Sequence, residues 1–230
     1  MSNKRLPKEI ADAHALSPSG IYYIHDEVNM RKGKAMIIGP EGTPYAHCPL
    51  IFEFEFPSDY PFSSPSVRFI TCDGATRFHP NLYVNGKVCL SILGTWSGPK
   101  WGAVMTISTV LTSIQSLLEA NPIVNEPGWE SYTLENNKAK DYAEYVQHAL
   151  VAYSFRGLLN LKRGVVLPEW QPFQDVLQVD ELISRLGKII EEKAVHDEKT
   201  YSVVYSMQGK TIWKDLNAMW NSVKLSPTTL

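Results

Sequence analysis

Within the segment 50–56, residues 52–56 alternate strictly between aromatic and acidic side chains. The alternating residues are Phe52, Glu53, Phe54, Glu55 and Phe56. Successive side chains of a strand point to opposite faces of a sheet, so this pattern predicts a strand with one buried face and one face in water. Three further stretches read as strands: Ile21–Ile24, Lys34–Ile38 and Val67–Thr71. Because short turns join all four, we expect an antiparallel meander backed by helices on one face.

Apolar residues recur at helical spacing after this expected sheet. The clearest run is Ile107, Val110, Leu111, Ile114, Leu117 and Leu118. Steps of three and four residues put these side chains on one stripe, which predicts a core-packing helix with Thr106 as its N-cap. A first helix over 4–14 and a long helix over 133–161 complete an α+β fold.

Turn-forming residues between Gly164 and Pro172 end the long helix and mark a boundary. We therefore divide the chain into a core domain, 1–163, and a mostly helical C-terminal extension, 164–230. The extension holds two amphipathic helices, over 179–190 and 212–223, and a strand-like alternation over 201–207. Exposed apolar stripes of this size are unusual on a monomer, so we expect the extension to pack on the core.

Composition excludes several classes of function. With 44% hydrophobic residues, 20% charged residues and a formal net charge of −2, the chain has no basic footprint for nucleic acid. No apolar run approaches the roughly 20 residues of a membrane-spanning helix, and the first residues lack the apolar run of a secretion signal. We expect an ordinary globular protein.

The cysteines are Cys48, Cys72 and Cys89, without a C-x-x-C pair or metal-ligand spacing. This odd count argues against a disulfide framework or a metal site, and for a reducing compartment, the cytoplasm or the nucleus. Cys48 and Cys72 fall in strand-like segments, so we expect both to be small buried apolar residues.

The third cysteine stands in a segment suited to acyl transfer. Asn85-Gly86 can form a tight turn that folds Cys89 back alongside Asn81. A thiol can carry an acyl group as a thioester, and a side-chain amide can donate a hydrogen bond to the oxyanion formed when an amine attacks. Two alternatives stay open at this point: Cys89 as a small buried residue, and Asn81 as a brace for the backbone.

The segment 79–93 resembles the active-site signature of ubiquitin-conjugating enzymes. The matching residues are His79-Pro80-Asn81, then Cys89 after seven residues, followed by Leu90-Ser91-Ile92-Leu93. The loop Tyr60-Pro61-Phe62-Ser63-Ser64-Pro65 resembles a second signature of that family. Asn85–Trp96, Ile114–Leu117 and Asn125–Gly128 are similar to its long Z-type subfamily, and the likeness covers roughly residues 3–160.

This resemblance implies the ubiquitin-conjugating fold and an enzyme. Cys89 would take ubiquitin or a ubiquitin-like modifier from an activating enzyme as a thioester, and pass it to a lysine of a substrate protein, alone or with a RING- or HECT-type ligase. No cofactor is implied, because the activating enzyme uses the ATP. Asn81 is the implied donor of a hydrogen bond to the oxyanion. His79 and Pro80 are implied to be structural parts of the flap, the segment that precedes the cysteine. Glu126, with Asn125, is the nearest match to the family's acidic gate.

The resemblance also implies surfaces for partner proteins. Lys4, Arg5 and Lys8 give a basic face to a first helix that helps to dock the activating enzyme. A solvated helix face is the simpler alternative for these three residues. Phe62 and Trp101 lie in loops that contact ligases in the family.

The sequence departs from the broader family at two places. Ser91 stands where an aspartate is frequent, and Gly102-Ala103 replaces a usual Ser-Pro in a ligase-contacting loop. The Z-type subfamily also carries a C-terminal extension, which there accompanies restriction to a particular activating enzyme. Both a selectivity role and a purely stabilising role fit the extension of this chain.

Two competing classes of function are weighed against the enzyme. A non-catalytic ubiquitin-binding variant or scaffold of the same fold lacks the cysteine, so Cys89 inside an intact signature argues against it. A cysteine hydrolase needs a base within reach of the thiol, usually from a distant segment. His79 instead precedes a proline in the flap, which favours a structural role.

Overall fold

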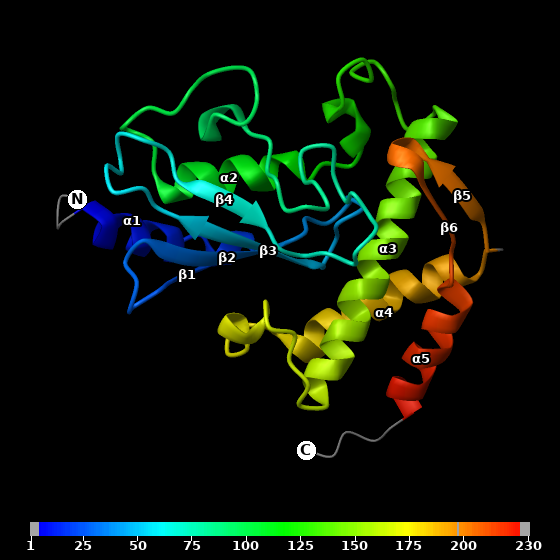
Figure 1. Ribbon diagram of the computed structural model, residues 1–230. Coiled ribbons are helices and arrows are strands. Elements are labelled where there is room, and N and C mark those ends of the chain that lie inside the picture. Colours follow the sequence, from blue (N-terminus) through cyan, green and yellow to red (C-terminus); the bar gives the residue numbers. More distant parts are fainter. Residues whose placement is uncertain (1–4, 197, 226–230) are drawn as a thin grey trace.

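The computed structural model describes residues 5–196 and 198–225, and its centre is a four-stranded antiparallel sheet. The strands are β1 (Ile21–His25), β2 (Lys32–Ile38), β3 (Pro49–Glu55) and β4 (Ser66–Phe69). They are neighbours in chain order (Figure 1). The register places Ile21 opposite Ile37, and Phe52 opposite Phe69. The expected meander is confirmed.

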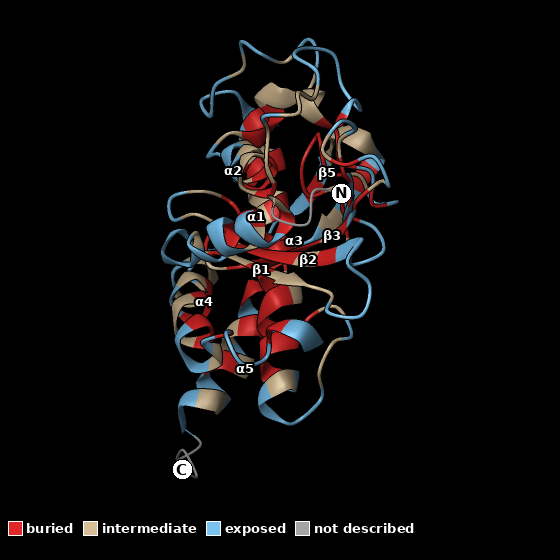
Figure 2. Ribbon diagram, turned by 90° about the vertical axis from the view of Figure 1, so that its left-hand side faces the viewer, coloured by how far each residue is buried: buried red, intermediate tan, exposed pale blue. Residues whose placement is uncertain are grey.

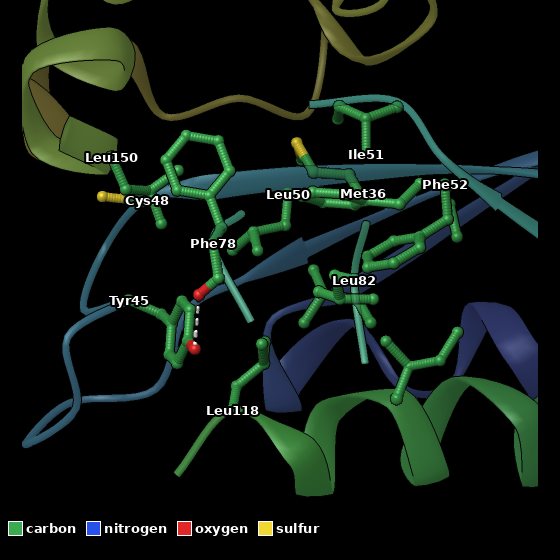
Figure 3. Close-up of a cluster of buried hydrophobic side chains, with 14 of the residues drawn as sticks. Met36, Tyr45, Cys48, Leu50, Ile51, Phe52, Phe78, Leu82, Leu118 and Leu150 are labelled. Carbon is green, nitrogen blue, oxygen red and sulfur yellow. Dashed lines mark hydrogen bonds between the residues drawn. The ribbon is translucent and has the colours of Figure 1, made fainter. Parts of the chain in front are cut away.

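One face of the sheet packs against α2 (Ile107–Leu117), with α1 (Arg5–His14) beside it (Figure 1). Figure 3 shows Phe52 and Leu82 pointing towards α2. The helix begins as the sequence predicts: the N–H of Thr109 donates to Thr106 Oγ1 at 3.3 Å, and the N–H of Thr106 donates to Thr109 Oγ1 at 3.2 Å. Its buried residues are Ile107, Val110, Leu111 and Ile114.

The opposite face of the sheet is also covered, which corrects the expectation of helices on one face only. Trp170 and Phe173 follow α3 (Asn137–Lys162) and are fully buried. Their segment, yellow in Figure 1, contacts β1, and Figure 3 shows Met36 and Ile51 pointing towards it. Met36 belongs to an unbroken apolar run in β2 that begins at Ala35, and such runs are typical of strands that are buried on both faces.

The extension continues with α4 (Val179–Ala194) and ends with α5 (Trp213–Leu225). α4 packs against both α3 and α5. Gly187 allows the approach of α5, because a Cβ atom at this position would lie 2.4 Å from Cε2 of Trp220. Buried residues of the extension and of the sheet form one apolar cluster, so buried segments run through both halves of the molecule in Figure 2.

The sequence predicts one strand over 201–207, and this prediction is wrong. The structure has two short antiparallel strands there, β5 (Thr200–Val203) and β6 (Met207–Lys210), which lie beyond α3 in Figure 1. Tyr205 and Ser206 separate them, with φ angles of 63° and 57°. Left-handed residues cannot continue a strand, so the chain reverses at this point. We call residues 200–210 the hairpin.

The longest helix, α3, has 26 residues and carries charged side chains along its length. Within the described residues, no helix is both long enough and apolar enough to cross a membrane.

Candidate active site

A tight turn lies between Asn81 and Cys89, where the sequence predicts it. The N–H of Gly86 donates to the Tyr83 carbonyl at 2.9 Å, and the N–H of Tyr83 donates to the Lys87 carbonyl at 3.0 Å. Gly86 has a φ of 89°, a conformation that glycine adopts at little cost. We call residues 78–88, which this turn folds back on themselves, the flap.

Asn81 and Cys89 are joined by two hydrogen bonds. The N–H of Cys89 donates to the Asn81 carbonyl at 2.9 Å, and Asn81 Nδ2 donates to the Cys89 carbonyl at 2.8 Å. The structure therefore brings the two residues together, with the amide bonded to the backbone rather than to the sulfur. A primary amide has two N–H hydrogens, and this bond uses one of them.

Cys89 itself is only 1% exposed. Thr95 fastens the backbone on both sides of it: Thr95 Oγ1 donates to the Val88 carbonyl at 2.6 Å and accepts from the N–H of Leu90 at 3.0 Å. The thiol is thus a buried group in a segment held by side-chain hydrogen bonds. A large partner reaches the sulfur only when neighbouring side chains move aside.

His79 is buried beneath the flap. Its Nδ1 accepts a hydrogen bond from the N–H of Asn81 at 2.9 Å, which places the ring proton on Nε2. Burial lowers the pKa of His79 to about 3, against a smaller opposing effect of the Leu117 carbonyl. A ring that is neutral and already bonded to the backbone is a weak general base. The geometry favours the structural role over a cysteine–histidine pair.

Arg77 connects the flap to the extension. Its guanidinium donates to the Pro80 carbonyl and lies over the rings of Tyr83 and Tyr205, at 3.7 and 4.0 Å from their centroids. Glu126 completes the group, because its Oε2 accepts from the Tyr205 hydroxyl at 2.6 Å and lies 3.8 Å from Arg77. The sequence analysis missed this cluster. The position of Arg77, two residues before the signature, could have indicated a role at the site. No residue near Tyr205 in the sequence indicates its contact with Arg77.

The two residues of the expected acidic gate have different surroundings. Glu126 faces Arg77 and the hairpin, as described above. Asn125 instead donates from Nδ2 to Glu119 Oε1 at 2.8 Å and to the Pro122 carbonyl at 3.3 Å. Of the two, Glu126 alone carries a charge beside the flap.

The other two cysteines differ in exposure. Cys48 is buried as expected, and burial raises the pKa of its thiol to about 12. Cys72 is exposed, which corrects the expectation that it is buried. The strand β4 ends at Phe69, so Cys72 already lies in the turn that follows. Within residues 5–196 and 198–225, no three His, Cys, Asp or Glu side chains cluster as a metal site would need.

Comparison with known protein families gives a match over residues 5–151, to the family described as ubiquitin-conjugating enzyme. That match includes both signatures, the flap and Cys89. The chain belongs to the ubiquitin-conjugating enzyme family. The expected family and its fold are therefore confirmed.

Curated members of this family include several Z-type relatives. The human ubiquitin-conjugating enzyme E2 Z is 39% identical over 183 residues, which are 76% of this chain and 51% of the human protein. The Danio rerio protein of that name is 45% identical over 159 residues, 69% of this chain and 48% of the relative. The chain thus spans about half the length of these relatives. Their similarity supports the predicted likeness to the Z-type subfamily.

A solved structure of the same family agrees with the fold. The E2 domain of a Toxoplasma gondii ubiquitin conjugating enzyme superposes with a TM-score of 0.50 at 28% sequence identity. It covers 65% of this chain and 98% of the Toxoplasma domain. The Toxoplasma domain is matched over nearly its full length, and this chain carries extra C-terminal helices.

The expected activating-enzyme contacts are only partly displayed on the surface. Lys4 lies outside the described residues. Lys8 is exposed on α1, whereas Arg5 turns inward to pair with Glu9 and to donate to the Met105 carbonyl at 2.7 Å. Glu9 is buried and also accepts from the N–H of Ile107 at 3.1 Å, so these contacts fix α1 against α2.

The two expected ligase contacts lie in adjoining loops. Phe62 is 79% exposed, an unusual state for a large aromatic residue. Trp101 is partly buried, and its Nε1 donates to the Pro61 carbonyl at 2.7 Å. The Trp101 loop thereby supports the loop that presents Phe62.

Proposed function

We propose that this chain is a ubiquitin-conjugating enzyme that carries its modifier on Cys89. The observation that supports this best is the pair of hydrogen bonds between Asn81 and Cys89, because they place the two matched residues of the signature in one small unit. Family membership supports the reaction class, and the geometry of this unit supports Cys89 and Asn81 as the residues that perform it.

Two acyl transfers make up the proposed reaction. In the first, the Cys89 thiolate attacks the carbonyl carbon of the modifier's C-terminal thioester on the activating enzyme, and that enzyme's cysteine leaves as a thiolate. In the second, a lysine amine attacks the new thioester, the oxyanion collapses, and Cys89 leaves. Because Cys89 is 1% exposed, charging also requires a local opening of the side chains around it.

Asn81 has two roles in this proposal. The observed bond to the Cys89 carbonyl braces the nucleophile's backbone. The second hydrogen of the amide donates to the oxyanion during lysine attack. The attacking lysine loses its proton in a desolvating site, since burial lowers the pKa of an amine. Glu126 is our candidate for the acidic residue at that gate. Asn125 is the weaker candidate, because its side chain is bonded to Glu119.

The partners of the proposed enzyme follow from its chemistry. They are ubiquitin or a ubiquitin-like modifier, an activating enzyme that consumes ATP, substrate proteins, and a RING- or HECT-type ligase where one is used. We place these reactions in the cytoplasm, the nucleus or both. Phe62 and Trp101 are the proposed ligase contacts, and Lys8, with Arg5 and Lys4, belongs to the proposed activating-enzyme surface.

A charging assay tests this function. The protein is mixed with an activating enzyme, ATP and ubiquitin, and the products are separated with and without reductant. We expect a reductant-sensitive adduct for the wild-type protein, a reductant-resistant oxyester for Cys89→Ser, and no adduct for Cys89→Ala. Cys72→Ala is the matched control, since it removes an exposed thiol outside the site.

Normal charging of the Cys89→Ala protein would end this proposal. The same assay, repeated over a panel of modifiers and activating enzymes, identifies the pair that this chain serves. A wild-type protein that binds ubiquitin but forms no adduct with any pair would instead favour the non-catalytic variant.

A further inference from the structure

The Arg77 guanidinium is enclosed by groups from two distant parts of the chain. Tyr83 of the flap lies on one side, with its centroid 3.7 Å from the guanidinium carbon, and Tyr205 of the hairpin lies 4.0 Å away. A cation over an aromatic face is attracted by the negative charge of the ring face. Enclosure by two rings restricts the directions in which the guanidinium can point. The direction it takes is towards the Pro80 carbonyl, to which it donates.

Besides Arg77, two residues contact the side chain of Tyr205. Its hydroxyl donates to Glu126 Oε2 at 2.6 Å, and its ring meets the edge of Tyr142 at a centroid distance of 6.0 Å. Its backbone has a φ of 63°, a region that a bulky residue seldom occupies. Glycine would adopt that conformation more easily, so contacts of the Tyr205 side chain offset the cost of its backbone conformation.

The contacts form a continuous path from the hairpin to the nucleophile. Tyr205 contacts Arg77, Arg77 donates to the carbonyl of Pro80, and Pro80 directly precedes Asn81. Asn81 then donates to the Cys89 carbonyl. The backbone of Arg77 is tied down as well, because its N–H contacts Met207 Sδ at 3.1 Å and its carbonyl accepts from Tyr142 at 3.0 Å.

We propose that Tyr205 is a positioning residue for the conjugation reaction, which the C-terminal extension supplies to the flap of the core domain. It holds the Arg77 guanidinium against the Pro80 carbonyl, and so fixes the position of Asn81 relative to Cys89. This inference rests on the proposed function. It adds a role at the flap to the selectivity and stabilising roles that the sequence leaves open for the extension.

The test compares variants of two tyrosines in the same hairpin. Tyr205→Ala removes the ring and the hydrogen bond to Glu126, and Tyr205→Phe removes only the hydrogen bond. Tyr201→Ala is the matched control, because the Tyr201 hydroxyl also donates to a glutamate, Glu144 Oε2 at 2.8 Å, but on α3 and away from the flap. Each protein is charged, and single-turnover discharge of the thioester to free lysine is measured beside a melting curve.

We expect Tyr205→Ala to slow discharge about tenfold while charging changes by less than threefold. Tyr205→Phe should recover most of the discharge rate, because the ring still covers the guanidinium. Tyr201→Ala should discharge at the wild-type rate even if its melting temperature falls as far. Unchanged discharge in Tyr205→Ala, or an equal loss in Tyr201→Ala, would overturn the inference.

A second measurement does not depend on charging. Hydrogen exchange of the backbone amides in residues 78–90 should become at least tenfold faster in Tyr205→Ala and stay unchanged in Tyr201→Ala. If the wild-type protein accepts no modifier, the proposed function fails, but this exchange result still reports on the support of the flap. If the wild-type protein is active and exchange in Tyr205→Ala is unchanged, the positioning role fails by itself.

Discussion

Asn81 forms hydrogen bonds through its backbone and its side chain, and the balance between them decides its role. Its N–H is bonded to His79 Nδ1, and its Nδ2 to the Cys89 carbonyl. Both bonds brace the flap. In the proposed reaction, the second amide hydrogen stabilises the oxyanion that forms when an amine attacks. The two roles of Asn81 can therefore be distinguished by measuring charging and lysine discharge separately.

Replacement of Asn81 by alanine should lower the rate of lysine discharge by about 100- to 1000-fold, the usual cost of losing one oxyanion donor. Charging should fall much less, because bracing alone serves that step. Asn85→Ala is the matched control, since Asn85 Oδ1 accepts from the N–H of Lys87 at 3.1 Å in the same flap. Single-turnover rates and melting curves provide the comparison. Equal losses in both steps, with a lower melting temperature, would show a folding defect instead.

Contacts at the site were more predictable from the sequence when the two residues lie close together along the chain. Asn81 and Cys89 are eight residues apart, and a single turn determines their approach. Cys72 was misplaced because the apolar pattern of β4 does not show where the strand ends. The contact between Tyr205 and Arg77 was not predictable, because it depends on the packing of every element between them. The functional roles of these residues stay predictions.

The elements of the extension approach one another closely through small residues. α4 and α5 meet where Gly187 faces the Trp220 ring. The same arrangement recurs at Gly157 of α3, where a Cβ atom would lie 2.8 Å from Trp170. In both places, glycine lowers the intrinsic stability of the helix by about 1 kcal/mol relative to alanine. Its lack of a side chain allows an indole ring to pack on the helix backbone.

Gly187→Ala should lower the free energy of unfolding by about 1–3 kcal/mol, even though alanine is the better helix former. The added methyl group collides with a rigid ring and pushes α5 away from α4. Gly102→Ala should leave stability unchanged, because nothing lies within 4 Å of a Cβ atom at that position. Urea unfolding of both variants makes the comparison. A Gly187→Ala protein as stable as the wild type would contradict the close packing of α4 on α5.

The positions of helices and strands were more predictable from the sequence than the segments that pack against them. All four strands of the sheet and the five α-helices of the described residues lie where the sequence predicts them, with ends that differ by a few residues. The hairpin was read as one strand because alternation alone does not reveal a left-handed residue at its centre. The second covered face of the sheet was missed for a related reason. Its covering segment, around Trp170, has no regular period.

At the scale of the whole molecule, the core and the extension share one apolar cluster. Trp170, Phe173 and Leu216 of the extension are fully buried in it, and removal of a large core side chain typically costs about 3–5 kcal/mol. The extension therefore contributes to stability. Its role in choosing an activating enzyme stays a prediction, for which the charging panel is the measurement.

Acid should weaken the docking of the extension. His148 Nε2, on α3, accepts from the N–H of Ile212 at 2.9 Å, and this bond requires a neutral ring. Burial, with a smaller contribution from Arg156, lowers the pKa of His148 to about 4, while Glu198 acts in the opposite direction. The unfolded chain binds the proton first as pH falls below about 6.5. Titration of His148 should thus lower the free energy of unfolding by about 1.6 kcal/mol between pH 6.5 and 5.0, and His79 should add a decrease of similar size.

Urea unfolding at pH 7.5, 6.5 and 5.0 checks this dependence. His148→Gln should lose about half of the decrease, because glutamine accepts the same hydrogen bond without titrating. His14→Gln is the control, since His14 is exposed on α1. An unchanged decrease in His148→Gln would assign the whole effect to other groups.

The position of Tyr205 in the chain also has a consequence for biosynthesis. Tyr205 lies 116 residues after Cys89, and ribosomes add roughly 5–20 residues per second, so about 6–23 s pass between the synthesis of the two residues. If Cys89 and Tyr205 have the proposed roles, a nascent chain holds its nucleophile during that interval without the side chain that supports the flap. Translation through the hairpin should then precede the first efficient turnover, and a truncated translation product should keep its cysteine but transfer its cargo slowly.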